Sequence, residues 1–345
     1  MSRTEWSSIY WEGNGLFENK TILITGGTGS WGKELTTQLL EKKPKEIRIY
    51  SRNELLQVSM ERSFRNPSLT FFIGDIRDRN RVFEVCESVD YIFHLAALKH
   101  VPVCEEQPYE AIKTNIDGTK NLIDAAIFRG VRKVIDVSTD KAVDPLNLYG
   151  MTKAIGERLI IHANRKNTTR FVCIRGGNVM GTNGSVIPYF IEQIKTDNRI
   201  TITDKGMTRY FLTLKQAIKL LFKACEASYG GETFVMQMPA CRMIDLAEII
   251  VKHFGNDKTK IVEIGKRVGE KTHEVLISRY ESSSTFIFDE NYYVVFPMIQ
   301  IDGLKEFYES TQRLIPVDFE EYASNQRIMN PQEIEDLLNQ GGFFQ

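Results

Sequence analysis

The chain has 345 residues, of which 42% are apolar and 26% charged, and this composition is that of a globular protein and excludes a disordered one. The formal net charge of -1 gives no electrostatic reason to expect nucleic acid or an anionic membrane as a partner. No segment reaches the ~18 apolar residues that a membrane-spanning helix needs. The first residues include Glu5 and Glu12 and do not resemble a signal peptide, so we expect a cytoplasmic protein.

The cysteines predict neither a zinc site nor a disulfide framework. They are scattered, with no Cys-x-x-Cys pair and no histidine at metal-ligand spacing. We therefore expect buried, reduced thiols and no bound metal. The five residues are Cys86, Cys104, Cys173, Cys225 and Cys241.

Strand-like and helix-like segments alternate from Lys20 onward. Apolar runs at 21–25 and 171–174 have the length and composition of buried parallel strands. Similar runs end near Tyr50, Ile73, Leu95 and Val137. The alternation predicts an α/β fold of the Rossmann type, with a doubly wound parallel sheet.

Three regions are expected along the chain. Residues 1–16 are polar with isolated aromatic side chains and are interpreted as an N-terminal extension. Residues 17–178 contain the alternating segments and are expected to form the dinucleotide-binding domain. Beyond Asn178 the segments shorten, so residues 179–345 are expected to form mainly a smaller substrate-binding lobe, with some segments returning to the first domain.

A glycine-rich turn follows the first predicted strand. Gly26, Gly29 and Gly32 have the spacing G-x-x-G-x-x-G, which lets the backbone approach a pyrophosphate at a helix N-terminus. About 20 residues farther on, an acid would bind the ribose of NAD. This chain has Ser51 and Arg52 there, and a hydroxyl and a cation suit a 2′-phosphate, so the predicted cofactor is NADP.

Tyr149 and Lys153 form a Y-x-x-x-K pair, which in a helix places both side chains on one face. A neighbouring ammonium, joined by an oxidised nicotinamide, favours the phenolate, and we expect the two to lower the tyrosine pKa so that Tyr149 accepts a hydroxyl proton. The Y-x-x-x-K pattern alone often occurs by chance on solvated helices. Here it is significant because it follows the polar residues 138–141.

Polar residues follow the fifth predicted strand, at the sheet edge where ligands of open α/β sheets bind. Thr139 can hydrogen-bond a substrate hydroxyl, and Asp140 with Lys141 offers a second acid/base couple that a simple oxidoreductase does not need. The alternative interpretation is a surface salt pair in a loop.

Together these motifs resemble those of bacterial UDP-N-acetylglucosamine 4,6-dehydratases, in the extended short-chain dehydrogenase/reductase superfamily. The resemblance covers about residues 16–296 and is closest to the inverting branch that opens pseudaminic acid synthesis, because retaining relatives commonly carry methionine where this chain has Tyr149. The motifs are TGGTGSWG, YSRNE, FFIGDIRD, HLAALKHVP, KTNIDGT, STDKA, NLYGMTK, GNVMG, GSVIP, ITDKGMTRY and VGEKTHEV.

The resemblance implies a mechanism in which the cofactor is recycled and stays bound. Tyr149, with Thr139 and Lys153, deprotonates the 4-hydroxyl as hydride leaves carbon 4. Lys141 then removes the proton on carbon 5 while Asp140 protonates the departing 6-hydroxyl. Hydride returns to carbon 6, and carbon 5 is reprotonated from the opposite face.

The resemblance also implies a set of binding residues. Those expected around the dinucleotide are Gly26, Thr28, Gly29, Ser30, Trp31, Gly32, Ser51, Arg52, Asn53, Asp75, Ile76, Leu95, Ala96, Ala97, Lys99, Asn115, Tyr149 and Lys153. Asp75 stands where adenine could be recognised, although it could equally cap a loop. Those expected around the UDP-sugar are Lys99, Asn178, Gly184, Ser185, Val186, Pro188, Thr201, Thr203, Arg209, Arg267 and Glu270.

One departure from the family pattern leaves alternatives open. Gly176 stands where the family usually has tyrosine, so the floor under the sugar is expected to be wider, and the enzyme could release or consume a UDP-6-deoxy-sugar 5,6-ene. A second alternative is a nucleotide-sugar 4-epimerase, which would have no use for Asp140 and Lys141. A regulator that senses NADP is disfavoured because such proteins typically lose the tyrosine–lysine pair. Helices near 108–129 and 149–165 could pair subunits in a homo-oligomer, a dimer or a hexamer.

Overall fold

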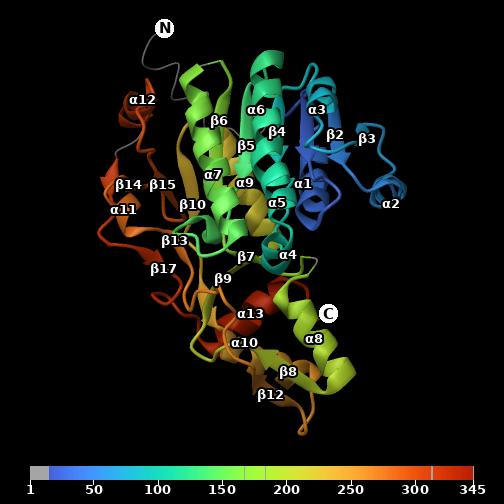
Figure 1. Ribbon diagram of the computed structural model, residues 1–345, viewed down its shortest axis with the longest axis vertical. Coiled ribbons are helices and arrows are strands. Elements are labelled where there is room, and N and C mark those ends of the chain that lie inside the picture. The colour runs from blue at the N-terminus through green and yellow to red at the C-terminus, as the bar shows by residue number, and fades with distance from the viewer. Residues whose placement is uncertain (1–14, 167, 183, 312–313, 345) are drawn as a thin grey trace.

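The computed structural model describes residues 15–344 apart from positions 167, 183, 312 and 313. The N-terminal extension expected at 1–16 lies outside this part except for its last two residues. The described chain forms a large lobe built on a twisted sheet and a smaller lobe below it (Figure 1). Within the described residues, no helix is long and apolar enough to span a lipid bilayer.

A twisted sheet of ten strands among the described residues forms the large lobe, in the order β16-β14-β15-β10-β6-β5-β4-β1-β2-β3. The strands from β10 to β3 are parallel, whereas β14, β15 and β16 join antiparallel at the far edge. The predicted doubly wound parallel sheet is therefore confirmed. The bounds are β1 Thr21–Thr25, β2 Glu46–Ser51, β3 Leu69–Ile73, β4 Tyr91–His94, β5 Lys133–Val137, β6 Arg170–Arg175, β10 Thr233–Met236, β14 Thr285–Ile287, β15 Tyr292–Val295 and β16 Ile315–Pro316.

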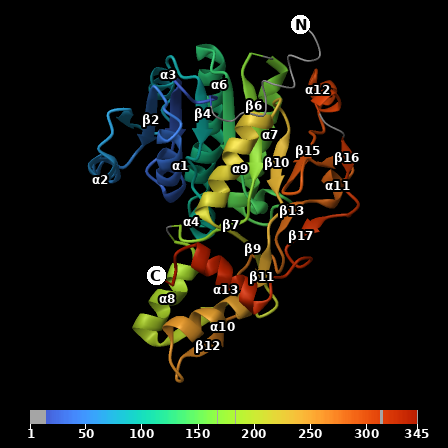
Figure 2. The same ribbon diagram turned by 180° about the vertical axis from the view of Figure 1, so that it is seen from behind.

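Helices cover both faces of this sheet, because successive strand side chains point to opposite sides. Ile22 and Ile24 pack with α1 and α9, seen in front in Figure 2, whereas Leu23 packs with α3, α6 and α7, seen in front in Figure 1. The bounds are α1 Ser30–Leu40, α2 Glu54–Phe64, α3 Arg79–Val85, α4 Val101–Glu106, α5 Pro108–Ile112, α6 Gly118–Arg129, α7 Leu148–Ala163, α9 Leu214–Ala227, α11 Arg279–Ser282 and α12 Leu304–Thr311. A π-helical turn, Lys113–Asp117, interrupts the helix expected near 108–129.

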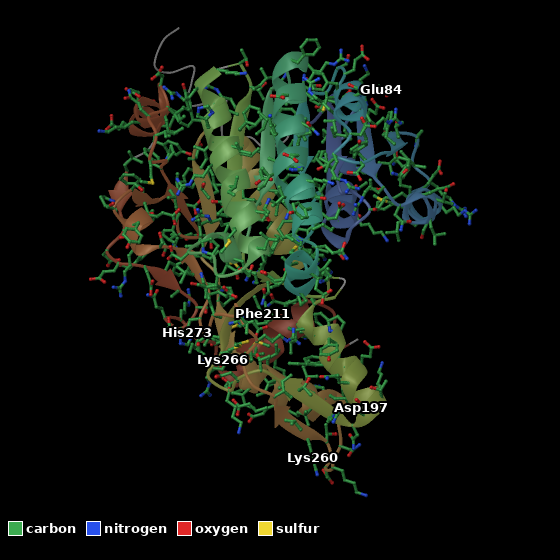
Figure 3. All side chains as sticks on the ribbon, viewed as in Figure 1. Glu84, Asp197, Phe211, Lys260, Lys266 and His273 are labelled. Carbon is green, nitrogen blue, oxygen red and sulfur yellow. The ribbon has the colours of Figure 1, made fainter. Side chains whose placement is uncertain are left out.

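The smaller lobe contains short sheets and three helices among the described residues. Its apolar core includes Phe190, Ile250 and Leu338, from α8, α10 and α13. The bounds are β7 Asn178–Val179, α8 Val186–Asp197, β8 Arg199–Ile202, β9 Thr208–Leu212, β11 Ala240–Arg242, α10 Met243–Phe254, β12 Lys260–Glu263, β13 Val275–Ile277, β17 Tyr322–Ala323 and α13 Pro331–Gln340. Phe211 on β9 lies where the two lobes meet (Figure 3).

Candidate functional site

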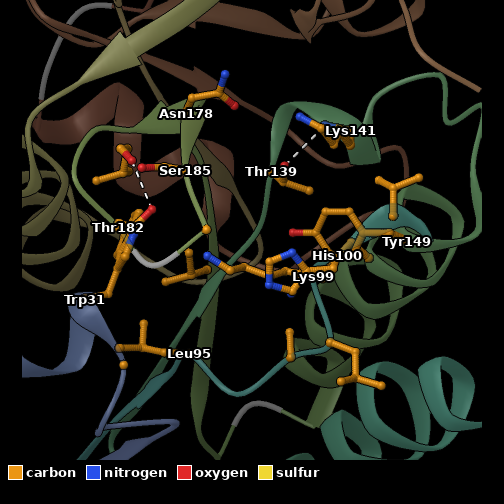
Figure 4. Close-up of a pocket in the computed structure, with 18 of the residues that line it drawn as sticks. Trp31, Leu95, Lys99, His100, Thr139, Lys141, Tyr149, Asn178, Thr182 and Ser185 are labelled. Carbon is orange, nitrogen blue, oxygen red and sulfur yellow. Dashed lines mark hydrogen bonds between the residues drawn. The ribbon is translucent and has the colours of Figure 1, made fainter. Parts of the chain in front are cut away.

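A cavity of about 1000 Å³ runs along the carboxyl ends of the parallel strands and continues between the two lobes. The loops after β1, β4, β5 and β6 line one side of it, and the start of α8 with the segment 267–274 lines the other. Figure 4 shows Thr139, Lys141 and Tyr149 together on one side of the cavity, with Thr182 and Ser185 across from them. Ligands of open α/β sheets bind at this edge.

The glycine-rich turn lies at one end of the cavity, where the sequence predicts a dinucleotide. Gly26 has a φ of +69°, and a Cβ atom there would lie 2.9 Å from the Ala96 nitrogen, so only glycine fits. Gly32 does not line the cavity. A Cβ atom on Gly32 would lie 2.2 Å from the Gly27 oxygen, so this glycine lets α1 pack closely on the turn. The cavity is lined here by Gly26, Thr28, Gly29, Ser30 and Trp31.

Charged side chains gather where β2 and β3 end. Arg52 is 53% exposed at its side chain, and its Nη1 lies 3.8 Å from Asp75 Oδ2. Arg77 donates a 2.6 Å hydrogen bond to the same oxygen, and although burial opposes it, this bond lowers the pKa of Asp75. The Asn53 side chain caps α2 by accepting from the Leu56 nitrogen at 3.0 Å. Ser51, Arg52, Asn53, Asp75 and Ile76 all line the cavity.

The segment after β4 crosses the middle of the cavity, which is lined by Leu95, Ala96, Ala97 and Lys99. Burial lowers the pKa of Lys99. Asn115 lies behind this segment and does not line the cavity. Its side chain accepts from the Leu98 nitrogen at 2.8 Å and donates to the Thr152 hydroxyl at 3.0 Å, so it fixes the segment against α7.

Tyr149 and Lys153 lie on one face of α7 and both line the cavity. Lys153 Nζ lies 3.3 Å from Asp136 Oδ2, with both side chains almost fully buried. The protein groups alone shift the Tyr149 pKa upward, and Lys153 acts in the expected, lowering direction. Burial raises the pKa of Tyr149, and the opposing effects of Lys153, Lys141 and the Thr139 hydroxyl do not cancel it.

The turn formed by residues 139–141 follows β5. Lys141 Nζ donates to Asp140 Oδ1 at 3.0 Å and lies 3.4 Å from Glu274 Oε1. Thr139 and Lys141 line the cavity, whereas Asp140 is buried behind them and does not. A Cβ atom on Gly150 would lie 2.1 Å from the Lys141 oxygen, so α7 begins directly beneath this turn.

The residues expected around the UDP-sugar divide into two groups. Pro188, Thr201 and Thr203 do not line the cavity; Thr201 accepts a 2.8 Å hydrogen bond from Gln193, and the Thr203 hydroxyl lies 3.0 Å from Met207 Sδ. The cavity is lined by the others, namely Lys99, Asn178, Gly184, Ser185, Val186, Arg209, Arg267 and Glu270.

The cavity wall also contains residues outside the predicted set, among them His100 and Glu274, and the floor position expected at Gly176. His100 lies beside Gly184, where a Cβ atom would come within 2.9 Å of the imidazole. Gly176 lines the cavity and has no atom of the described residues within 4 Å of an added Cβ, so the floor is open there. Glu274 lines the cavity from the smaller lobe. Its position depends on pairing between distant segments, and its motif gave no sign of that contact.

In the part of the chain that the structure describes, no group of three or more histidine, cysteine, aspartate or glutamate side chains is arranged to hold a metal ion. All five cysteines are buried, and none forms a disulfide.

The sequence matches the family model described as polysaccharide biosynthesis protein over residues 22–296. It is 45% identical to the UDP-N-acetylglucosamine 4,6-dehydratase (inverting) of Campylobacter jejuni over 290 residues, which cover 83% of this chain and 85% of that one. It is 41% identical to a UDP-glucose 4-epimerase of Rickettsia bellii over 331 residues, covering 94% and 96% of the two chains.

A solved structure gives a similar fold over almost the whole length. The X-ray structure of Pen from Bacillus thuringiensis superposes with a TM-score of 0.88 at 39% identity, covering 96% of this chain and 100% of that one. The relatives therefore include both dehydratases and epimerases, so sequence similarity does not distinguish these two reactions and the arrangement of the site residues is needed.

Proposed function

Because the chain belongs to the polysaccharide biosynthesis protein family, as an extended short-chain dehydrogenase that modifies nucleotide sugars, we propose that it is a UDP-N-acetylglucosamine 4,6-dehydratase of the inverting type. The observation that carries the proposal is the second acid/base group. Lys141 lies 3.0 Å from Asp140 and 3.4 Å from Glu274, on the same cavity wall as Tyr149. A 4-epimerase moves a hydride and a hydroxyl proton and needs no such group.

The dinucleotide end of the cavity suits NADP. The turn at Gly26 and the start of α1 would hold the pyrophosphate, and Arg52 would meet the 2′-phosphate. When bound, the cofactor would supply reversible hydride transfer to and from the sugar, and each cycle would regenerate it. Among the described residues, the tip of β2 carries no acid on the cavity wall that would prefer the ribose hydroxyl of NAD.

Tyr149 supplies the base for the first step of the proposed reaction. As the phenolate, which Lys153 and Thr139 favour, Tyr149 would take the proton of the 4-hydroxyl and become the phenol as hydride leaves carbon 4. Lys153 is itself held by Asp136, so the positive charge stays next to the phenol. A carbonyl at carbon 4 then acidifies the proton on carbon 5.

Lys141 lies where it can take that proton, and a carboxyl group must protonate the 6-hydroxyl so that it leaves as water. Hydride returns to carbon 6 and carbon 5 receives a proton from the opposite face, giving a UDP-4-keto-6-deoxy-sugar. Arg209, beside Glu274, and Arg267 both line the cavity and suit the diphosphate of the substrate.

The alternative in which the enzyme releases or consumes a 5,6-ene is supported by a separate observation, the open space at Gly176. Gly176→Tyr would fill this floor, and an added Cβ meets no described atom, so the fold should tolerate it. If the parent protein releases an ene, the tyrosine variant should raise the share of keto product measured by NMR. An unchanged product ratio would show that the open floor does not decide the product.

Substitution of Lys141 separates dehydration from epimerisation. With UDP-N-acetylglucosamine as substrate, Lys141→Met should lose formation of the 6-deoxy product by ~10²-fold or more while still binding the cofactor. Lys99→Met, in the same cavity, is the comparison for loss of a buried ammonium. An epimerase would convert the substrate to its 4-epimer and would be barely affected by the Lys141 change.

We also propose that the chain forms a homodimer through α4, α5 and α7. Large apolar side chains are exposed on these helices, and exposed patches of this kind mark interfaces. Ile155→Glu should therefore shift the mass measured by light scattering toward the monomer, and an unchanged mass would contradict this interface. The exposed apolar residues are Val103, Tyr109, Ile112, Met151 and Ile155.

A further inference from the structure

Glu274 places a carboxylate beside Lys141 that the acid/base motif does not contain. Its Oε1 lies 3.4 Å from Lys141 Nζ and 3.6 Å from Arg209 Nε. The residue is only 3% exposed and lines the cavity, yet its Oε2 accepts no hydrogen bond from any residue that the structure describes. An unsatisfied buried carboxylate oxygen is costly, and in a cavity wall it indicates a chemical role.

The backbone around Glu274 is held rigidly. The Glu274 backbone nitrogen donates to the Ser324 hydroxyl at 2.9 Å, and the Ser324 backbone nitrogen donates to the Glu274 backbone carbonyl oxygen at 2.9 Å. Ser324 is fully buried and its hydroxyl also lies 2.6 Å from that of Thr208 on β9. Glu274 therefore lies between His273, which bridges to Thr208, and β13, which pairs with β17, and this anchoring holds a reactive group more accurately than a loose loop does.

The charges around Lys141 keep it protonated at rest. Although burial alone would lower it, Asp140 and Glu274 raise the pKa of Lys141, and Arg209 from β9 opposes them only in part. Other ionisable groups near this region are Tyr149 and Lys153 on α7 and Tyr210 on β9, which interacts with Asp140. An ammonium cannot remove a proton from carbon, so Lys141 must first pass a proton to an acceptor within reach.

We infer that Glu274 is this acceptor and the acid of the proposed dehydration, an inference that rests on the proposed function. An N–H bond of Lys141 breaks and an O–H bond forms on Glu274, so the ion pair becomes an amine and a carboxylic acid. The amine then takes the proton from carbon 5. Glu274 gives its proton to the 6-hydroxyl, which leaves as water, and the original ion pair is restored.

This assignment changes the role expected for Asp140. Asp140 does not line the cavity, and its Oδ1 accepts hydrogen bonds from Thr139 and Lys141. Asp140 Oδ2, like Glu274 Oε2, has no hydrogen-bond partner among the described residues, but only Glu274 is part of the cavity wall, so Asp140 positions the ammonium from behind. No reactant other than the substrate and the bound dinucleotide is needed for this proton balance.

The first test measures Lys141 without relying on turnover. The protein as purified is treated with a trace of acetic anhydride at one mildly alkaline pH, and acetylation of Lys141 is quantified by mass spectrometry. Glu274→Gln removes a negative charge, so more of Lys141 is unprotonated, and labelling should rise by about tenfold or more. Glu274→Asp keeps the charge and should label nearly as slowly as the parent.

The second test measures turnover of UDP-N-acetylglucosamine. Glu274→Gln should lower kcat by ~10²-fold or more, with partial recovery in Glu274→Asp. The matched control is Glu84→Gln, which removes an exposed carboxylate on α3 whose ion pair is with Arg81. Glu84→Gln should match the parent in both tests.

Two results would overturn the inference. One is unchanged Lys141 labelling in Glu274→Gln, and the other is turnover by that variant within about threefold of the parent. If the parent itself does not turn over the substrate, the proposed function fails, and the labelling experiment still decides whether Glu274 controls Lys141.

Discussion

Two charged hydrogen bonds, of 2.9 and 2.7 Å, join the Arg175 guanidinium at the end of β6 to the Glu157 carboxylate on α7. The same guanidinium donates two 2.8 Å hydrogen bonds to Glu281 on α11. Although burial opposes it, Glu157 and Glu281 raise the pKa of Arg175. Because Glu157 lies about one and two helical turns beyond Lys153 and Tyr149, this cluster fixes to the sheet the face of α7 that carries these two residues.

Removing the charge of Glu157 should destabilise the protein measurably. In Glu157→Gln, Arg175 loses one charged partner inside the protein and keeps Glu281, so we expect the free energy of unfolding to fall by about 2–3 kcal/mol. Urea denaturation followed by circular dichroism measures this change. Glu320→Gln, which removes an exposed partner of Arg279, should change it by less than about 0.5 kcal/mol. Equal effects in the two variants would refute a structural role for the cluster.

Tyr149→Phe should abolish most activity without unfolding the protein. Only the phenol hydroxyl group is removed, and loss of a general base lowers kcat by ~10²–10⁴-fold. Dinucleotide binding, followed by fluorescence, should stay close to that of the parent. Tyr109→Phe, on the exposed side of α5, is the matched control. A Tyr149→Phe variant that keeps more than about a tenth of the parent activity would remove Tyr149 from the proposed mechanism.

Arg52 should decide the choice between NADP and NAD. Arg52→Ala removes the cation that would meet the 2′-phosphate, and a charged hydrogen bond contributes about 1.5–3 kcal/mol, so NADP binding should weaken by about 10–100-fold. NAD binding should change little. Calorimetric titration with both dinucleotides measures this, with the exposed Arg65→Ala as control at the end of α2. Equal weakening for both dinucleotides would argue against a 2′-phosphate site.

His94 should make stability depend on pH in the acid range. Its ring lies 2.7 Å from the Thr25 hydroxyl and is fully buried, and burial lowers its pKa to about 4. Unfolded histidine binds a proton near pH 6.5, so the stabilisation is complete above that pH and is lost as pH falls toward about 4.

Over that interval the free energy of unfolding should fall by about 3 kcal/mol through this residue alone. Urea denaturation at several pH values gives the free energy of unfolding as a function of pH, and this free energy should fall less steeply toward acid pH in His94→Asn than in the parent. His162→Asn, at an exposed position of α7, should retain the parent slope. If His94→Asn keeps the full slope, other groups cause the acid sensitivity.

The sequence predicted the sheet well because its signals are local. Apolar runs at 21–25 and 171–174 became the buried strands β1 and β6, and the glycine turn at Gly26 lies where its spacing placed it. Local patterns do not show which strands pair across long distances. The joining of β14, β15 and β16 to the far edge of the main sheet therefore required the structure.

The same reason explains the errors in the site. Thr201 is close to the expected loop in sequence, but β8 turns it toward Gln193 and away from the cavity. The effect of Lys153 on Tyr149 was expected with the right sign, whereas the larger effect of burial depends on packing that a sequence does not show. Glu274 reaches Lys141 only because β13 pairs with β17 and its preceding segment pairs with β9.

The most direct test of the account is a single incubation of the purified protein with UDP-N-acetylglucosamine in deuterated water, without added cofactor, followed by proton NMR. The account predicts a 6-deoxy signal with deuterium at carbon 5, ring couplings of the inverted configuration and no net consumption of NADPH. A 4-epimer that retains its 6-hydroxyl and its proton at carbon 5 would contradict the account and identify an epimerase.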